Sequence, residues 1–144
     1  MPPGPSSFWD SCASTVGMFF DALVGSDFEP GADGAATVHL TLREEHHGVH
    51  GFVHGGVLCT LAHQSAGAAA YSLLKSGQEA AMIEMKINFL KASWSGALHS
   101  RSTVIRHGGR TAVVETRITG DDDELRAFVV STFLVLDRAL QAPR

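Results

Sequence analysis

One segment in the middle of the chain carries no charged side chain. From Val57 to Leu74 there is no Asp, Glu, Lys or Arg, and this length approaches that of a membrane-spanning helix. Much of its apolar character, however, comes from alanine and glycine. It also contains the polar side chains of His63, Gln64, Ser65 and Ser72. We therefore expect a buried helix of a soluble protein and not a membrane span.

Apolar and small residues recur in this segment at helical spacing. They are Val57, Leu58, Leu61, Ala62, Ser65, Ala66, Ala69 and Ala70. The pattern predicts one broad packing face on a helix over residues 55–75. Ala66 to Ala70 are all small, so a sheet can approach closely there. Lys75, Ser76 and Gly77 predict the end of the helix, with a cation in the last turn and a glycine just beyond it.

Strands are predicted on both sides of this helix. The chain has no proline between Gly31 and Ala142, which permits long strands. Strands are expected over residues 19–28 and 35–42, with a turn at 29–34, and a short helix capped by Ser6 or Ser7 is expected to run to Met18. Four strand-like runs follow the central helix, at 80–91, 97–107, 111–119 and 125–137. The short turns between them predict an antiparallel meander. The fold class is therefore α+β, a long central helix wrapped by a curved antiparallel sheet of about six strands.

Size and charge narrow the possible functions. The chain has 144 residues without a repeat or linker, so we expect one domain over 1–144. A net charge of −4 argues against a protein that binds nucleic acid or an anionic membrane. Two cysteines, Cys12 and Cys59, are too few for a disulfide framework, and no basic and apolar leader is visible at the start. We expect a cytoplasmic protein.

A segment rich in histidine and glycine, Glu44 to Gly56, precedes the helix and is predicted to be a loop. His46 and His50, or His50 and His54, have the spacing of two metal ligands on one helical face. Glycines interrupt any helix there, and no matching cysteine or carboxylate cluster follows. The segment also lacks the Lys-Ser/Thr of a phosphate-binding loop. We therefore expect no metal site.

The start of the helix offers a different chemistry. Gly55 and Gly56 lack a Cβ, so a carbonyl group can approach their backbone N–H groups closely. First-turn N–H groups have no partner within a helix and lie at the positive end of its dipole. Such donors can stabilise the oxyanion that forms in acyl transfer. A plain glycine-rich helix entry is the alternative interpretation.

Three motifs carry a family resemblance: Gly51-Phe52-Val53-His54-Gly55-Gly56-Val57-Leu58-Cys59-Thr60-Leu61-Ala62, then Ile83-Glu84-Met85-Lys86-Ile87-Asn88-Phe89-Leu90, then His107-Gly108-Gly109-Arg110. In order and spacing, the chain resembles the PaaI-like acyl-CoA thioesterases of the hotdog fold over about residues 20–137. The resemblance implies a homodimer, often paired into a homotetramer, with the substrate thioester between protomers. It implies that Gly55 donates its N–H to the thioester carbonyl and that His54 belongs to the catalytic motif. No cofactor is implied, because coenzyme A is part of the substrate.

The chain departs from the family pattern at four positions. The carboxylate that usually follows the motif histidine by nine residues is replaced by His63. The Asn or Gln expected six residues before that histidine is Gly48. Met82 stands where a Thr or Ser often begins the following strand, and Ala92 replaces the usual proline. The fold expectation does not depend on these positions.

Other residues are candidates for the altered site. His63 can act as a general base toward water near neutral pH, or it can be a buried, hydrogen-bonded structural histidine. Gln64 beside it could orient water or the thioester. Substrate-binding candidates are Gly56, His47, His50, Met82, Glu84, Lys91 and Arg110. The plainer alternatives are solvated loop histidines, a surface pair of Glu84 with Lys86, solvated cations, and a small buried thiol at Cys59.

The sequence thus predicts hydrolysis of a small, medium or aryl acyl-CoA, with Gly55 polarising the carbonyl and His63 activating water. The alternative is a catalytically impaired hotdog dimer that binds an acyl-CoA-like ligand. A hotdog dehydratase is disfavoured, because no His-Phe-Pro-like motif is present.

Overall fold

The computed structural model describes residues 20–137. A short helix, α2 (Phe20–Val24), leads into strands β1 (Asp27–Ala32) and β2 (Ala35–Thr41). A 3₁₀ turn (Glu44–His46) and the histidine-rich loop precede the central helix α3 (Gly55–Tyr71). Four strands follow it: β3 (Gln78–Phe89), β4 (Ala97–His107), β5 (Thr111–Gly120) and β6 (Leu125–Asp137). The helix expected up to Met18, and Cys12, lie outside the described residues.

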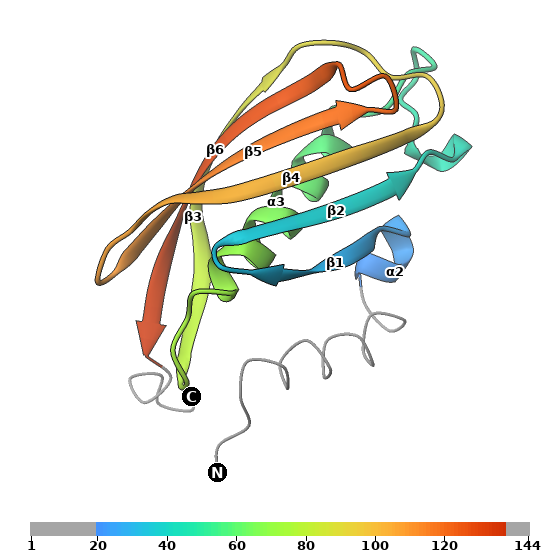
Figure 1. Ribbon diagram of the computed structural model, residues 1–144. Coiled ribbons are helices and arrows are strands. Elements are labelled where there is room, and N and C mark those ends of the chain that lie inside the picture. Colours follow the sequence, from blue (N-terminus) through green and yellow to red (C-terminus); the bar gives the residue numbers. More distant parts are fainter. Residues whose placement is uncertain (1–19, 138–144) are drawn as a thin grey trace.

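The six strands form one antiparallel sheet in the order β1-β2-β4-β5-β6-β3. Figure 1 shows this curved sheet wrapped around α3. The meander expectation is correct for β4, β5 and β6 but wrong for β3, which pairs with β6 at the far edge of the sheet. β4 pairs with β2 instead. A short turn signal between two strands therefore did not imply that they pair, because the chain from β3 to β4 crosses to another part of the sheet.

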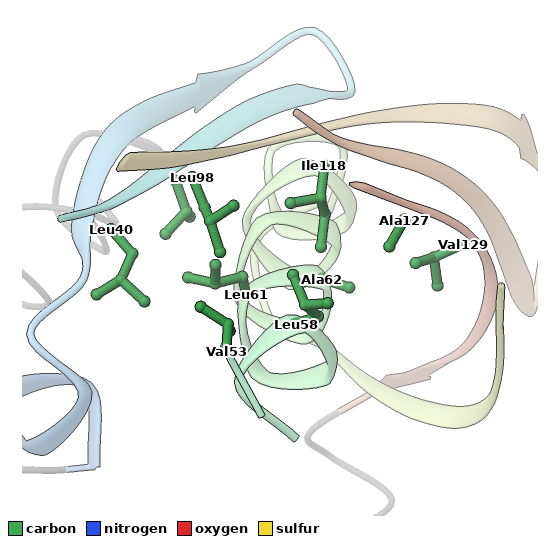
Figure 2. Packing of buried hydrophobic residues seen from close by; sticks show 10 residues of the cluster. Leu40, Val53, Leu58, Leu61, Ala62, Leu98, Ile118, Ala127 and Val129 are labelled. Atoms are coloured by element: carbon green, nitrogen blue, oxygen red, sulfur yellow. The ribbon is translucent and has the colours of Figure 1, made fainter. Parts of the chain in front are cut away.

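The helix packs its predicted face against the concave side of the sheet. Leu58, Leu61 and Ala62 in its first half form the main core cluster, shown in Figure 2. Their partners on the strands and loop are Val38, Leu40, Val53, Leu98, Ile118, Ala127 and Val129. Four alanines of the second half, Ala66, Ala68, Ala69 and Ala70, pack in a second cluster with Ala36, Ala112, Val114 and Phe133. The expected close approach of sheet to helix at the small residues is confirmed.

Hydroxyl groups cross the middle of this apolar core. The Ser65 Oγ atom on α3 lies 2.7 Å from Ser100 Oγ and 2.7 Å from Ser102 Oγ on β4. Ser102 Oγ in turn lies 2.6 Å from Thr116 Oγ1 on β5. All four side chains are buried, and Ser65 Oγ donates to the backbone oxygen of Leu61 at 3.0 Å, so it can accept from the neighbouring hydroxyl groups.

The segment before β1 differs from the expected strand over residues 19–28. Residues 20–24 are helical, and Gly25, at φ +78°, ends the helix. Its last carbonyl groups accept hydrogen bonds from distant side chains: Arg43 Nη2 donates to the Leu23 and Val24 oxygens, and His46 Nε2 donates to the Val24 oxygen at 2.8 Å. These non-local bonds favour a helix where local composition favours a strand.

Two further boundaries differ from expectation. α3 ends at Tyr71 with Ser72 as its cap, so Lys75 lies beyond the last turn. In β3 a bulge between Met82 and Glu84 reverses the alternation of faces. Ile83 is therefore 60% exposed, whereas Met82 packs against the second core cluster. Among residues 20–137, no helix is both long and apolar enough to span a membrane.

Candidate active site

The N-terminus of α3 presents one amide without an acceptor among the described residues. His54 is the N-cap, and its Nδ1 atom accepts from the Gly56 N–H at 2.9 Å. The backbone oxygen of His54 accepts from the Val57 N–H, also at 2.9 Å. Gly56 is therefore already satisfied, and Gly55 keeps the available first-turn donor. Since Nδ1 of His54 accepts, the proton of the neutral ring is on Nε2.

Gly55 also provides room for an aromatic ring. A Cβ at this position would lie 3.2 Å from two ring atoms of Phe89, the last residue of β3. The ring of Phe89 is 55% exposed, so it covers one side of the helix start without being buried itself. Close packing against Phe89 is thus a second reason, besides the approach of a ligand, for a residue without a side chain at position 55.

A groove of about 480 Å³ lies along the side of α3. Its lining comes from α2, α3 and β3: Phe20, Asp21, Cys59, Thr60, His63, Gln64 and Met85. Two of the predicted catalytic residues, His63 and Gln64, therefore meet in one cavity. The lining is apolar at Phe20 and Met85 and polar at Asp21, His63 and Gln64, which suits an acyl group and a water molecule side by side.

His63 and Gln64 have different environments although they are adjacent. The His63 side chain is exposed, and no described residue forms a hydrogen bond or ion pair with it. Gln64 is 9% exposed, and its Nε2 atom donates to Asp21 Oδ1 at 2.6 Å. Gln64 Oε1 is buried, and no residue of the described chain donates to it.

Asp21 and Met85 are groove residues that sequence reasoning missed. Asp21 could not be predicted as a groove residue because residues 19–28 were expected to form a strand. A position in such a strand does not predict a contact with the central helix. Met85 occupies the groove in place of the predicted Met82, because the bulge in β3 turns Met82 toward the core. A helix-start signal at Asp21, with Gly25 four residues later, was the available clue to α2.

The loop histidines lie away from this groove. His46 is buried and bonded through both ring nitrogens, to the Arg43 N–H and the Val24 oxygen, so neither is open to a metal. His47 lines a second groove of about 590 Å³ beside Trp94. His50 stacks on Phe52 at 5.9 Å between ring centroids. Within residues 20–137, no group of three or more His, Cys, Asp or Glu side chains is arranged to hold a metal ion.

His47 is held in a way that favours its protonated form. Its Nε2 lies 2.9 Å from the Trp94 oxygen and its Nδ1 lies 3.2 Å from the Glu44 oxygen. Both partners are acceptors, so only the doubly protonated ring satisfies both. The Trp94 carbonyl, aided by that of Glu44, raises the pKa of His47 above 6.5.

The remaining candidates have identifiable partners or open surroundings. Glu84 is exposed and accepts from Thr132 Oγ1 at 3.3 Å, while Lys86 donates to Asn88, so the expected Glu84–Lys86 pair is absent among the described contacts. Arg110 is exposed on the turn between β4 and β5. Burial raises the pKa of the Cys59 thiol, which keeps it protonated and supports the interpretation of a small apolar side chain.

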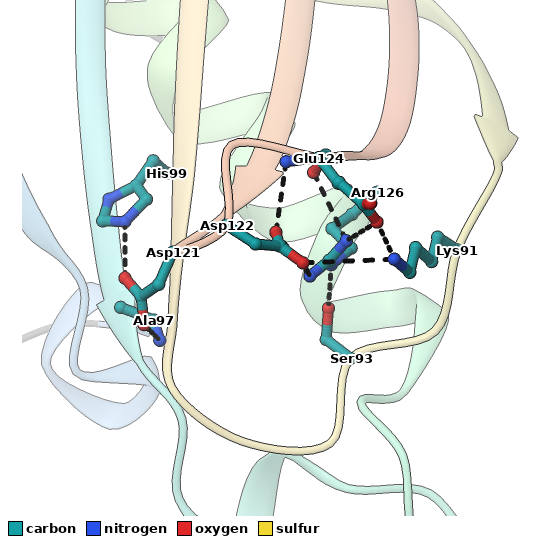
Figure 3. Close-up of polar contacts among 8 residues, drawn as sticks. All are labelled: Lys91, Ser93, Ala97, His99, Asp121, Asp122, Glu124 and Arg126. Atoms are coloured by element: carbon teal, nitrogen blue, oxygen red, sulfur yellow. Dashed lines mark hydrogen bonds and ion pairs between the residues drawn. The ribbon is translucent and has the colours of Figure 1, made fainter.

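Lys91 belongs to an ion cluster at the turn between β5 and β6, shown in Figure 3. Its ammonium group contacts Glu124 and lies 4.0 Å from Asp122. Arg126, which is buried, donates from Nη2 to both oxygens of Asp122 at 2.8 and 2.7 Å and from Nε to Ser93 Oγ. The Arg126 guanidinium holds the pKa of Asp122 below 3.8. Lys91 is therefore already paired with carboxylates of its own chain.

Comparison with known proteins gives a consistent result. A model of the thioesterase superfamily matches residues 50–127, more than half of the chain. The 1,4-dihydroxy-2-naphthoyl-CoA hydrolase of Listeria monocytogenes is 28% identical over 108 residues, which cover 75% of this chain and 88% of that protein. A solved thioesterase from Haemophilus influenzae has the same fold, with a TM-score of 0.82 at 18% identity over 100% of this chain and 97% of its own. A hypothetical thioesterase from Streptococcus pneumoniae, solved with coenzyme A, has a TM-score of 0.73 at 25% identity and covers 78% and 87% of the two chains. The chain has the hotdog fold and belongs to the thioesterase superfamily.

Proposed function

We propose that the protein is an acyl-CoA thioesterase of the PaaI-like type that hydrolyses small, medium or aryl acyl-CoA thioesters. The observation that carries this proposal is the free N–H of Gly55 at the start of α3, in a chain whose groove contains His63. The coenzyme A held by the Streptococcus pneumoniae protein and the hydrolase name of the Listeria monocytogenes relative support the choice of substrate. No separate cofactor is required, because coenzyme A enters as part of the substrate, and we place the reaction in the cytoplasm.

The proposed reaction is base-assisted hydrolysis. The Gly55 N–H donates to the thioester oxygen, and a water molecule attacks the carbonyl carbon while His63 accepts one of its protons. The tetrahedral oxyanion collapses, and the bond between carbon and sulfur breaks. The coenzyme A thiolate then takes the proton from His63. The products are a carboxylic acid and free coenzyme A.

We propose that two copies of the chain together form this site. Gly55 and His63 are eight residues apart on one helix, or about 12 Å along its axis at roughly 1.5 Å per residue. Groups that react with one carbonyl carbon must approach it to about 3–3.5 Å. We therefore propose that the Gly55 N–H and the His63 ring that act on one thioester come from different copies of the chain. Two antiparallel copies of α3 would bring Gly55 of one copy near His63 of the other.

The far edge of the sheet supplies a surface for such pairing. β3 is an edge strand of 12 residues, and an unpaired strand edge readily adds another strand. Ile83, Phe89 and Leu90 on and beside it are 55–60% exposed. We propose a homodimer joined along β3, with a homotetramer as a further assembly. In that arrangement Arg110, which has no ion-pair partner among the described residues, is available for the coenzyme A phosphates.

Free-thiol release from a panel of acyl-CoA thioesters tests this function. The wild-type protein is expected to release coenzyme A from at least one aryl or short acyl thioester, and His63→Ala is expected to lower kcat about 100-fold. Gly67→Ala on the same helix is the matched control, because a Cβ there meets nothing within 4 Å. The absence of release from every thioester would overturn the proposal and favour the binding-only alternative. Light scattering should give the mass of a dimer or tetramer.

A further inference from the structure

We infer that Asp21 on α2 is a positioning residue for this hydrolysis: its carboxylate fixes the Gln64 amide so that Gln64 Oε1 and His63 together orient the attacking water. The inference rests on the proposed function. It also supplies the groove with a carboxylate at a place where α3 has none, since residues 55–71 contain no Asp or Glu.

The contact between Asp21 and Gln64 determines which way the amide points. Gln64 Nε2 lies 2.6 Å from Asp21 Oδ1. An ionised carboxylate has only acceptors, so the amide must present its NH₂ group to it. The reversed amide would place two oxygen atoms against each other at the same distance. Asp21 therefore fixes the direction of Gln64 Oε1 as well as that of Nε2.

Gln64 Oε1 needs a donor that the described chain does not provide. The atom is buried, and none of residues 20–137 donates to it. Buried acceptors in native proteins almost always have a partner, which can be water or a ligand. Gln64 lines the groove together with His63 and Asp21. We infer that a water molecule bound between Gln64 Oε1 and the groove is this donor.

Two acceptors are what an attacking water needs. Its two protons can be donated to Gln64 Oε1 and to the His63 ring, and its remaining lone pair is then directed away from both. His63 takes the proton that leaves during attack, whereas Gln64 only holds the water. Orientation of this kind raises the rate of the chemical step more than it changes the binding of substrate.

Asp21 is itself held in place from a distant part of the chain. Arg43 and His46 donate hydrogen bonds to the carbonyl groups at the end of α2. The Gly25 N–H donates to the backbone oxygen of Asp21 at 2.8 Å. These contacts prevent α2 from unwinding and keep the carboxylate against α3. A merely structural bond between α2 and α3 would need the same geometry, so kinetics must separate the two roles.

The test compares Asp21→Asn, Gln64→Met and the double variant in the full-length protein, with a CoA thioester that the wild type hydrolyses. Asp21→Asn is expected to lower kcat about tenfold with KM within about twofold, because an asparagine no longer fixes the amide direction. Gln64→Met, which keeps the side-chain volume, should lower kcat at least as much. The double variant should be no slower than Gln64→Met alone. Asp27→Asn, at an exposed residue of β1 whose side chain has no hydrogen bond within the described chain, is the control and should match the wild type.

Two further measurements make the outcome specific. The pH at which kcat/KM falls on the acid side should be the same for Asp21→Asn and wild type, because His63 and not Asp21 accepts the proton. The NMR signal of the Gln64 side-chain amide should move in Asp21→Asn and stay in Asp27→Asn, whether or not any thioester is hydrolysed. Any one of four results would overturn the inference. They are an unchanged kcat in both single variants, a kcat in the double variant lowered by the product of the two single effects, an acid-side fall of kcat/KM at a different pH in Asp21→Asn, and an unmoved Gln64 amide signal in Asp21→Asn. Failure of the wild type on every thioester, by contrast, would remove the proposed function and leave the amide measurement as the test of the geometry.

Discussion

His39 on β2 and His99 on β4 face each other on the outer side of the sheet, with their Nδ1 atoms 2.7 Å apart. His39 Nε2 lies 2.7 Å from Glu29 Oε1, and His99 Nε2 lies 3.0 Å from Asp121 Oδ1. A single proton must lie between the two Nδ1 atoms, because two would collide and none would leave two lone pairs opposed. The four side chains therefore form one continuous hydrogen-bonded chain from β1 to the turn between β5 and β6.

The acidic end of this chain makes stability sensitive to low pH. The Ala97 N–H, together with His99, holds the pKa of Asp121 below 3.8. A carboxyl whose folded pKa is depressed stabilises the fold above its unfolded pKa and loses that contribution as the pH falls through the folded value. We predict that Asp121→Asn flattens the dependence of unfolding free energy on pH below about 3.8. Urea unfolding at a series of pH values measures this, and Asp27→Asn should leave the dependence as in wild type.

The pKa shift of His47 makes stability depend on pH in the opposite direction. Because the Trp94 carbonyl raises the pKa of His47, its stabilisation of the loop is complete below pH 6.5 and is lost as the pH rises through the raised value. We predict faster amide exchange in residues 44–53 at pH 8.5 than at pH 6, after correction for the intrinsic pH dependence of exchange. His47→Gln should remove the difference and His50→Gln should retain it. Equal protection in the wild type at both pH values would contradict this assignment.

Gly55 and Gly67 of α3 have different surroundings and should respond differently to substitution by alanine. At Gly67 an added Cβ meets nothing within 4 Å, so Gly67→Ala should stabilise the protein by roughly 0.5–1 kcal/mol through helix propensity. At Gly55 the same Cβ would lie 3.2 Å from the Phe89 ring, so Gly55→Ala should lack that gain. Thermal unfolding compares the two. Phe89→Ala in the Gly55→Ala background should restore the gain if the ring is the cause.

The buried hydroxyl cluster should contribute measurably to stability. Ser65→Ala would leave the hydroxyl groups of Ser100 and Ser102 without their shared partner inside the core. We expect a loss of about 1–3 kcal/mol of unfolding free energy, the usual cost of an unsatisfied buried polar group. Ser95→Ala, at an exposed position, is the control. A loss below about 0.5 kcal/mol for Ser65→Ala would mean that the remaining hydroxyls re-pair.

Much of the fold could be predicted because its signals are local. The bounds of β4 and β6 agree with those expected, since glycine and aspartate turns mark the ends of these runs. The pairing of β3 could not be predicted, because the alternation of one strand does not say which other strand lies beside it. α2 was missed for a related reason, since it depends on bonds from Arg43 and His46, about 20 residues away.

Part of the candidate site could also be predicted from the sequence. Gly55 follows from the start of the helix, whereas His63 and Gln64 follow from the family resemblance, and the structure places the last two in the same groove. Asp21 comes from α2, and Met85 replaces Met82 through a bulge, so neither could be found without the tertiary contacts. The capped state of Gly56 likewise depends on the rotamer of His54, which a sequence does not specify.

The place of β3 at the outer edge has a consequence for synthesis of the protein. Within residues 20–137, β3 pairs only with β6, and Gln78 donates a hydrogen bond to Asp137, 59 residues later. As the chain leaves the ribosome, β3 must wait for this partner strand until nearly all of the described residues have emerged. We expect a nascent chain that stalls before residue 125 to leave β3 without this partner, and its backbone N–H and C=O groups are then open to other polypeptides.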